Sequence, residues 1–306
     1  MALRNNPLDD IVKCNVEIME PASDDAAFNN ILIVVPGPVA AGTLSTDKTF
    51  SVSSADDLLD YGYTTSDTAY LAAEAAFAQN PSPDKLYFRV RLKVTTGSGE
   101  GATTEYEDIK TTLSRANGEA SFYGIHLGEF RSQTDVENAA AWTEANEKIF
   151  GFEYANISSC PTRNFSYYRT FGIFSGQADG YGAAVSDQPK VNEFAALAWM
   201  AKCFGYNPGS ETWHLKSLAS IVPSVLSSSD KTALEGNNIN SFLRYAGSNV
   251  TIGGKMLAWE WIDVIRFRDW LKNALHGCNF KFRSRQRFVR HAVQLAYRKR
   301  SFLSVL

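Results

Sequence analysis

Glycine-rich and histidine-containing segments are the parts of this chain whose residue types could bind phosphate or metal. Gly253-Gly-Lys255 resembles the end of a phosphate-binding loop, whose pattern is G-x-x-x-x-G-K-[ST]. However, Met256 replaces the hydroxyl residue that would coordinate magnesium, and Asn249 stands at the position of the first glycine. Both departures remove groups that phosphate binding needs, so we predict no nucleotide site here.

The four histidines do not have the spacing of a metal or catalytic site. They are His126, His214, His276 and His291. No H-E-x-x-H pattern occurs, and His276 with Cys278 supplies too few ligands for zinc. His126 lies in an apolar segment and is predicted to be a satisfied core or edge residue. We therefore predict no catalytic residues, no metal and no cofactor, and we expect that the chain is not an enzyme.

The cysteines and the hydropathy indicate a protein that folds in a reducing compartment. The cysteines are Cys14, Cys160, Cys203 and Cys278. They are scattered without a C-x-x-C pair, which predicts free thiols. The most aliphatic run, Ile31–Val35, is far shorter than the ~20 apolar residues of a spanning helix. We expect synthesis in a cytoplasm without membrane insertion.

Charge is distributed unevenly along the 306 residues, although the net charge is only −3. Asp269 is the last acidic residue, and nine lysines and arginines follow it. Residues 1–269 therefore carry 21 basic and 33 acidic side chains, a balance of −12, and residues 270–306 carry +9. Such asymmetry indicates a tail that meets an acidic partner or an acidic neighbouring copy, with nucleic acid as the rival reading.

Short apolar runs bounded by turn residues predict a mainly buried sheet. The chain is 44% hydrophobic and 21% charged, as is typical of a folded protein. The predicted strands are Ile31–Val35, Leu86–Leu92, Phe122–Leu127, Ile149–Tyr154, Thr170–Phe174 and Asn249–Gly254. Because they alternate with helical segments, the sequence predicts the α+β (mixed α/β) class, with helices flanking the sheet.

Helix-forming segments separate these strands. The predicted helices are Ala55–Tyr61 capped by Ser53 or Ser54, a segment from Ser66 or Asp67 to Gln79, one from Thr134 or Asp135 to Lys148, one from Asp187 to Phe204, Asp230–Glu235 and Trp261–Leu275. In the second helix, Tyr70, Ala73 and Phe77 have the spacing of a buried stripe. In the last, Asp269 lies three residues from both Arg266 and Lys272, so ion pairs that support the helix or dock it to a partner are expected.

Four segments, taken in order, resemble one protein family. They are Asp67–Phe88, Ala195–Lys216, Asn237–Asn240 with Asn249–Lys255, and Glu260–Lys272. The first contains Phe-Ala-Gln-Asn-Pro-Ser-Pro at the end of a helix. The last is similar to the E-[WY]-I-D-x-I-R-x-x-D-W-L signature of contractile tail sheath proteins. Over about residues 30–275 the chain resembles the small-sheath branch, which tailed phages and phage-tail-like bacteriocins share.

The resemblance implies an assembly and not a reaction. Such sheath subunits polymerise as stacked hexameric rings around an inner tail tube, with a baseplate and a tail terminator as further partners. Extended N- and C-terminal arms add strands to the sheets of neighbouring subunits. Contraction drives the tube through a cell envelope. The resemblance places the protein in a phage tail or tail-like injection particle made in a bacterial cytoplasm, with no direct binding of nucleic acid.

The same resemblance implies an organisation along the chain and an assembly interface. Residues 1–30 would form the N-terminal arm and residues 31–275 the sheath core, either undivided or split near 100–120 or 180–190. Residues 276–306 would form an atypical basic tail. Charged residues of the signature segment are expected to contact other subunits or the tube. They are Glu260, Asp263, Arg266, Arg268, Asp269 and Lys272.

Two features depart from the family pattern. Trp259 stands where the family leads us to expect glycine. After Lys272 the expected apolar helix and the K-[IV]-P-Y-T-D-x-G stretch are missing, and the basic tail takes their place. A shifted reading frame, genuine divergence and a functional basic arm all fit this change. The third reading gives the alternative function, a protein that binds nucleic acid or an acidic surface through its tail.

Overall fold

The computed structural model describes residues 28–96, 103–154, 166–175 and 194–277. The predicted terminal arms, the glycine-rich loop at 97–101 and the predicted helix start at Asp187 lie outside these residues. The chain divides after Phe267 into two compact units, and the sheet described below belongs to the first.

An eight-stranded mixed sheet forms the centre of this first unit, in the order β10-β9-β8-β7-β6-β1-β3-β2. Its strands are β1 (Ile31–Val35), β2 (Phe50–Val52), β3 (Leu86–Val90), β6 (Gly124–His126), β7 (Ile149–Tyr154), β8 (Thr170–Phe174), β9 (Asn240–Tyr245) and β10 (Ser248–Ile252). The six inner strands run parallel, and the edge strands β2 and β10 are antiparallel to their neighbours. A separate hairpin joins β4 (Lys93–Thr96) and β5 (Thr103–Tyr106).

The apolar runs of the sequence predicted five of the six inner strands, and β9 was not predicted. β1, β7 and β8 have the predicted bounds. β3 ends at Val90 and not at Leu92, because the chain there turns into the hairpin, where the N–H of Glu107 donates to the carbonyl of Leu92 (2.9 Å). Side chains of β1 enter the apolar cores on both faces of the sheet, which explains its unbroken aliphatic sequence.

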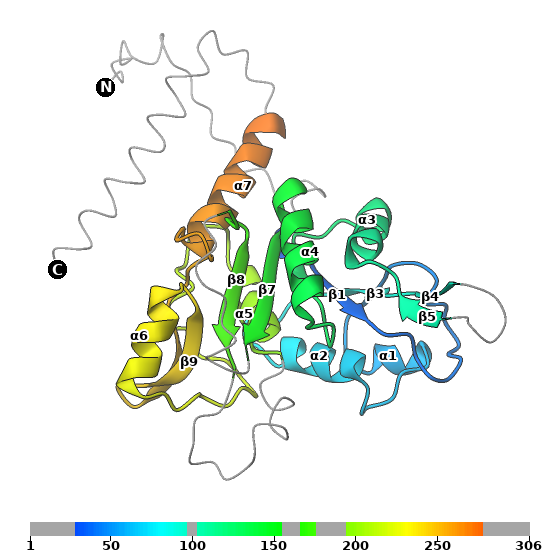
Figure 1. Cartoon of the computed structure of the whole chain (residues 1–306), viewed down its shortest axis with the longest axis horizontal. Helices are drawn as coiled ribbons and strands as arrows, with labels where there is room; N and C mark the ends of the chain where they lie inside the picture. The colour runs from blue at the N-terminus through cyan, green and yellow to red at the C-terminus, as the bar shows by residue number, and fades with distance from the viewer. Residues whose placement is uncertain (1–27, 97–102, 155–165, 176–193, 278–306) are drawn as a thin grey trace, which may run out of the picture. The chain divides into compact units, whose positions relative to one another are not determined.

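Helices cover both faces of the sheet, as predicted. One face carries α1 (Asp57–Asp60), α2 (Thr68–Phe77) and α5 (Ala195–Phe204), and the other carries α3 (Ile109–Glu119), α4 (Gln133–Ala145) and α6 (Ser228–Gly236). Figure 1 shows α4 and α5 on either side of β7. The long helix α7 (Ile262–Gly277) follows the last strand. Among the described residues, no helix is long and apolar enough to span a membrane.

The face that α2 buries differs from the predicted stripe. Its buried residues are Ala69, Ala72, Ala73 and Ala76. Tyr70 and Phe77 are only partly buried at the margin of the core. The prediction followed the large side chains, whereas α2 packs its alanines toward α5, where small side chains allow a close approach.

One predicted helix cap is corrected and another is confirmed. The hydroxyl of Ser132 caps α4 by accepting from the N–H of Asp135 (3.1 Å), so the helix begins before Thr134. At α1, the predicted cap Ser54 accepts from the N–H of Asp57 through its hydroxyl (3.4 Å), and Asp57 bonds back. Its carboxylate accepts from the N–H groups of Ser53 (2.8 Å) and Ser54 (3.1 Å).

Candidate assembly site

The loop between β10 and α7 is built on two glycines, and the backbone N–H groups of Gly253, Gly254 and Lys255 are already paired. Gly253 and Gly254 have φ angles of 111° and 95°, which favour glycine. The side-chain oxygen of Asn240 accepts from the N–H groups of Gly254 (2.7 Å) and Lys255 (2.9 Å). Because Asn240 occupies the donors that a phosphate would need, the glycines serve the turn into α7.

Arg266 is the most buried of the predicted interface residues, at 2% exposed. Its guanidinium lies over the ring of Phe204 (4.7 Å) and donates five hydrogen bonds. The acceptors are the carbonyl oxygens of Cys203 (2.8 Å), Phe204 (3.0 Å), Tyr206 (2.8 Å) and Phe28 (3.4 Å), and Oδ1 of Asn29 (2.8 Å). Burial lowers the pKa of Arg266 to about 10, so the group stays charged at neutral pH.

Arg266, a residue of α7, therefore caps the C-terminal end of helix α5. The last carbonyl groups of a helix lack partners within it and carry partial negative charge, which favours a cation. The predicted local ion pair with Asp269 is not among the hydrogen bonds above, and Asp269 pairs with its neighbour Arg268 (3.3 Å). The predicted role of Arg266 between subunits remains a prediction, since its described contacts lie within this chain.

The other predicted interface residues differ in exposure. Arg268 and Lys272 are exposed and lie four residues apart on α7, so they share one helix face. Asp269 is buried, at 7% exposed. Glu260 and Asp263 are partly buried, and Glu260 accepts from the N–H of Trp261 (3.1 Å). Arg268 and Lys272 are thus the two whose charges a partner could reach.

The outer edge of β10 is only partly covered. Thr251 donates its N–H to the carbonyl of Lys216 (2.9 Å) and accepts from the N–H of Leu215 (2.8 Å). Asn249 has the same orientation, because backbone groups alternate along an antiparallel pair. It is exposed, and within the described residues no strand pairs with β10 on this side. The strand thus offers backbone donors and acceptors at its edge.

Comparison with solved structures decides the fold. The helical sheath of the anti-feeding prophage in its contracted state aligns with 96% of this chain and 85% of its own, with a TM-score of 0.55 and 14% identity. The contracted sheath complex of an extracellular contractile injection system, PVC, gives 0.57 and 13%, over 88% and 76% of the two chains. A sheath tail protein from Desulfitobacterium hafniense gives 0.54 and 12%, over 96% and 89%. This chain has the fold of contractile sheath proteins.

Comparison by sequence, unlike comparison by structure, finds no related protein. No family model matches the chain, and no curated protein matches it. The fold is therefore shared at an identity of 12 to 14% with these structures.

One buried cluster in the sheath fold resembles a catalytic dyad. Nε2 of His126 lies 3.1 Å from both carboxylate oxygens of Glu153, and Nδ1 of His126 accepts from the N–H of Gly128 (3.1 Å). Glu153 also accepts from the N–H of Ala196 at the start of α5 (2.8 Å). Burial raises the pKa of Glu153, but His126 and Arg131 outweigh it, so the pKa lies below its usual value.

The His126 cluster is structural. His126 is 1% exposed and both ring nitrogens have partners, so it is the satisfied core residue that the sequence predicted. The carboxylate of Glu153 stabilises the N-terminal end of α5, as expected for an anion at that position. The described residues contain no group of three metal-ligating side chains.

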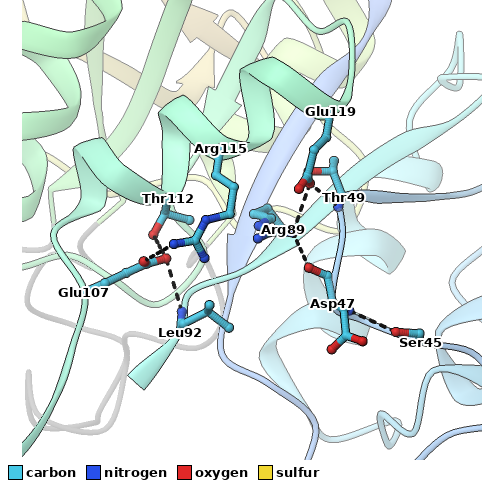
Figure 2. A network of polar contacts seen from close by, with 9 residues as sticks. All are labelled: Ser45, Asp47, Thr49, Arg89, Leu92, Glu107, Thr112, Arg115 and Glu119. Carbon is cyan, nitrogen blue, oxygen red and sulfur yellow. Dashed lines mark hydrogen bonds and ion pairs between the residues drawn. The ribbon is translucent and has the colours of Figure 1, made fainter. Parts of the chain in front are cut away.

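A network of buried charges on β3 was not predicted (Figure 2). Nη1 of Arg89 donates to the carbonyl of Asp47 (2.7 Å) and to Oε2 of Glu119 (3.0 Å). That same oxygen accepts from the N–H (2.7 Å) and hydroxyl (2.8 Å) of Thr49. Arg91, two residues on, forms a bidentate pair with Asp135 (2.8 and 3.0 Å).

Two signals in the sequence could have found this network. Arg89 in β3 and Arg91 just after it alternate with apolar residues, which places both side chains on one face of the extended segment. Helix α3, which carries Glu119, was missed, although Ile109, Leu113 and Ala116 have helical spacing. The arginines therefore attach α3 and α4 to the sheet through paired charges.

Trp259 adopts a conformation that suits glycine. Its φ angle is 79°, in the left-handed region, and the side chain is 48% exposed. Nζ of Lys255 lies 5.2 Å from the centre of the Trp259 ring and 5.7 Å from that of Trp261. The family resemblance led us to expect glycine here, and the backbone gives the physical reason, because a side chain with this φ is strained.

Proposed function

We propose that this chain is a structural subunit of a contractile tail sheath. The observation that carries the proposal is the shared fold, which spans 96% of this chain and 85% of a sheath subunit imaged in its contracted state. In this role the subunits polymerise as stacked rings around an inner tube and contract to drive that tube through a cell envelope. The protein would act without a catalytic site or cofactor.

Three features of the subunit support this role. A rigid core, buried on both faces of the sheet, suits a body that moves as a unit when a sheath contracts. The edge of β10 offers backbone groups to a strand from a neighbouring copy. Exposed Arg268 and Lys272 offer positive charge to an acidic surface of another copy or of the tube.

The proposed partners follow from the same role. They are other copies of the chain in hexameric rings, the inner tube protein, and the baseplate and terminator proteins at the two ends. The particle is a phage tail or a tail-like injection system. One of the similar structures is the anti-feeding prophage baseplate in its contracted state, and this likeness supports an association with a baseplate.

Sedimentation velocity over a range of protein and salt concentrations tests the proposal. A sheath subunit should sediment as large polymers above a threshold concentration, whereas a protein that binds nucleic acid through its tail should stay small. The second protein should bind duplex DNA with an affinity that falls steeply with salt and disappears when residues 273–306 are removed. Small species at all concentrations, with such DNA binding, would replace our proposal by the alternative.

A further inference from the structure

The contacts of Arg266 join three parts of the chain that are far apart in sequence. Phe28 and Asn29 immediately precede β1, Cys203 to Tyr206 end helix α5, and Arg266 itself lies in the first turns of α7. Asn29 and Arg266 are 237 residues apart along the chain. One guanidinium thus holds the point where residues 1–27 join the described body.

Only an arginine can make this set of contacts. The planar guanidinium presents donors in a fixed fork, so Nη1 reaches two carbonyl groups while Nη2 reaches Asn29, Phe28 and Phe204. A lysine has its three donors on one nitrogen and cannot span acceptors on both sides. Nε of Arg266 has no hydrogen-bond partner, so the binding is entirely through the two terminal nitrogens.

The other contacts near this junction are fewer. The ring of Phe28 lies 4.9 Å from that of Tyr123. Asn30 donates its side-chain amide to the carbonyl of Ser121 (2.9 Å), and its own carbonyl accepts from the N–H of Tyr123 (3.0 Å). Regular strand pairing begins only at Ile31. Asn29 is exposed, and its Oδ1 makes the shorter of the two hydrogen bonds that tie this junction to Arg266, at 2.8 Å against 3.4 Å for the carbonyl of Phe28.

We propose that Arg266 is a positioning residue that fixes where and in which direction the N-terminal segment leaves the subunit, through Asn29. The proposal rests on the proposed function, in which this segment reaches a neighbouring subunit. An arm can pair with a neighbour in one register only if its starting point is fixed, because a slip of one residue reverses the side chains of an added strand. The five oxygen acceptors around Arg266, which we call its carbonyl cage, supply that fixed point.

Hydrogen exchange of the full chain, kept dilute so that it stays unpolymerised, tests the proposal. Asn29→Ala removes the tie, so amides of residues 28–35 should exchange about fivefold faster, as loss of one hydrogen bond of about 1 kcal/mol implies. Asn29→Asp keeps the acceptor and adds a charge opposite to that of Arg266, so the same amides should exchange no faster than in the wild type. Amides of β7 should be unchanged in both variants.

Two results would contradict the proposal that Arg266 positions the N-terminal segment through Asn29. If the amides of residues 28–35 exchange at the wild-type rate in Asn29→Ala, the contact with Arg266 does not stabilise this segment. If the amides of β7 exchange faster by the same factor, the contact has a general structural role. The measurement does not need a polymer. If the wild type polymerises but its variants show no local change in exchange, only the positioning role of Arg266 is rejected. If the variants show the local change but the chain never polymerises, only the proposed function is rejected.

Discussion

Two of the buried arginines of this chain, Arg89 and Arg266, have their charges balanced in different ways. Arg89 on β3 lies against the carboxylate of Glu119 (3.0 Å), which the N–H and hydroxyl of Thr49 hold in place. Arg266 on α7 has carbonyl oxygens as its acceptors, four from the backbone and one from Asn29. The first region is held by paired charges that depend on pH, and the second by helix-end dipoles that do not titrate in acid.

This difference suits Arg89 to attaching a helix to the sheet and Arg266 to positioning a segment of the chain. A carboxylate and an arginine attract each other over a range of geometries, which suits the attachment of α3 to the sheet edge. The acceptors of Arg266 come from residues 28–29, from the end of α5 and from Tyr206, so one guanidinium contacts all three at once. This arrangement suits a residue that positions residues 28–29 relative to α5.

The largest expected effect is that of Arg266→Met. Removing the guanidinium leaves buried carbonyl groups at the end of α5 without donors, so the free energy of unfolding should fall by about 3 kcal/mol. Arg244→Met is the matched control, since loss of its exposed side chain should cost less than ~0.5 kcal/mol. Urea unfolding of the full chain measures both. Equal losses in the two variants would contradict the account of the carbonyl cage.

A smaller loss is expected for Arg89→Met, about 2 kcal/mol, because water can reach the released Glu119, whose side chain is 25% exposed. Glu119→Gln in the same background should restore part of the loss. A double-mutant cycle over the two positions should give a coupling of about 1 kcal/mol. Additive losses would show that the two side chains do not stabilise the fold as a pair.

The pH dependence of stability should distinguish the two regions. Burial raises the pKa of Glu119, but its hydrogen bonds from Thr49 and the charge of Arg89 outweigh this, so the folded pKa lies below the usual value. The group therefore adds stability above its unfolded pKa of about 4.3, and this is lost as pH falls through the folded pKa. Between pH 6 and 3 the free energy of unfolding should fall less steeply with pH in Glu119→Gln than in the wild type. In Arg266→Met its dependence on pH should match that of the wild type.

Trp259→Gly should stabilise the protein slightly. Glycine adopts the φ angle of 79° without strain, which favours the variant by about 1 kcal/mol, and loss of the contact with Lys255 offsets part of this. The expected increase is therefore about 0.5 kcal/mol, seen as a higher midpoint in urea. Trp259→Ala serves as the control, because it removes the ring but keeps the strain. A gain in both variants would assign the effect to the ring.

The double charge reversal Arg268→Glu with Lys272→Glu should leave the chain folded, because both side chains are exposed, and loss of the pair between Arg268 and Asp269 (3.3 Å) should cost about 1 kcal/mol. Polymerisation should nevertheless be lost if these charges meet an acidic partner surface. The control Lys93→Glu with Lys231→Glu changes the net charge equally at other exposed positions and should still polymerise. Normal polymers from the first variant would remove Arg268 and Lys272 from the interface.

The sequence predicted those parts of the fold that are set by local pattern. The apolar run of β1 and the alanine-rich α2 could be predicted directly, because burial and helix propensity act over a few residues. Helix α3 was missed, since its threonines, asparagine and glycine weaken its propensity and packing on the sheet stabilises it instead. The hairpin β4–β5 was missed because its residues are mostly exposed and lack an apolar face.

The contacts within the candidate site could not be predicted from the sequence, and its place in an assembly stays a prediction. The charges of the signature segment indicated local pairs at a spacing of three residues. The acceptors of Arg266 on α5 and beyond lie 60 to 63 residues away, and no local spacing carries that information. The strained φ of Trp259 was signalled only by comparison with the glycine expected from the family.

The sheath assignment itself is tested most directly by negative-stain electron microscopy of the purified full chain over a range of salt and protein concentrations. The account predicts striated hollow tubes, or rings that stack into them, and these should be absent from Arg268→Glu with Lys272→Glu. Uniform small particles at every condition, which persist when a family-like C-terminal segment replaces residues 273–306, would contradict the assignment of this chain to a contractile sheath.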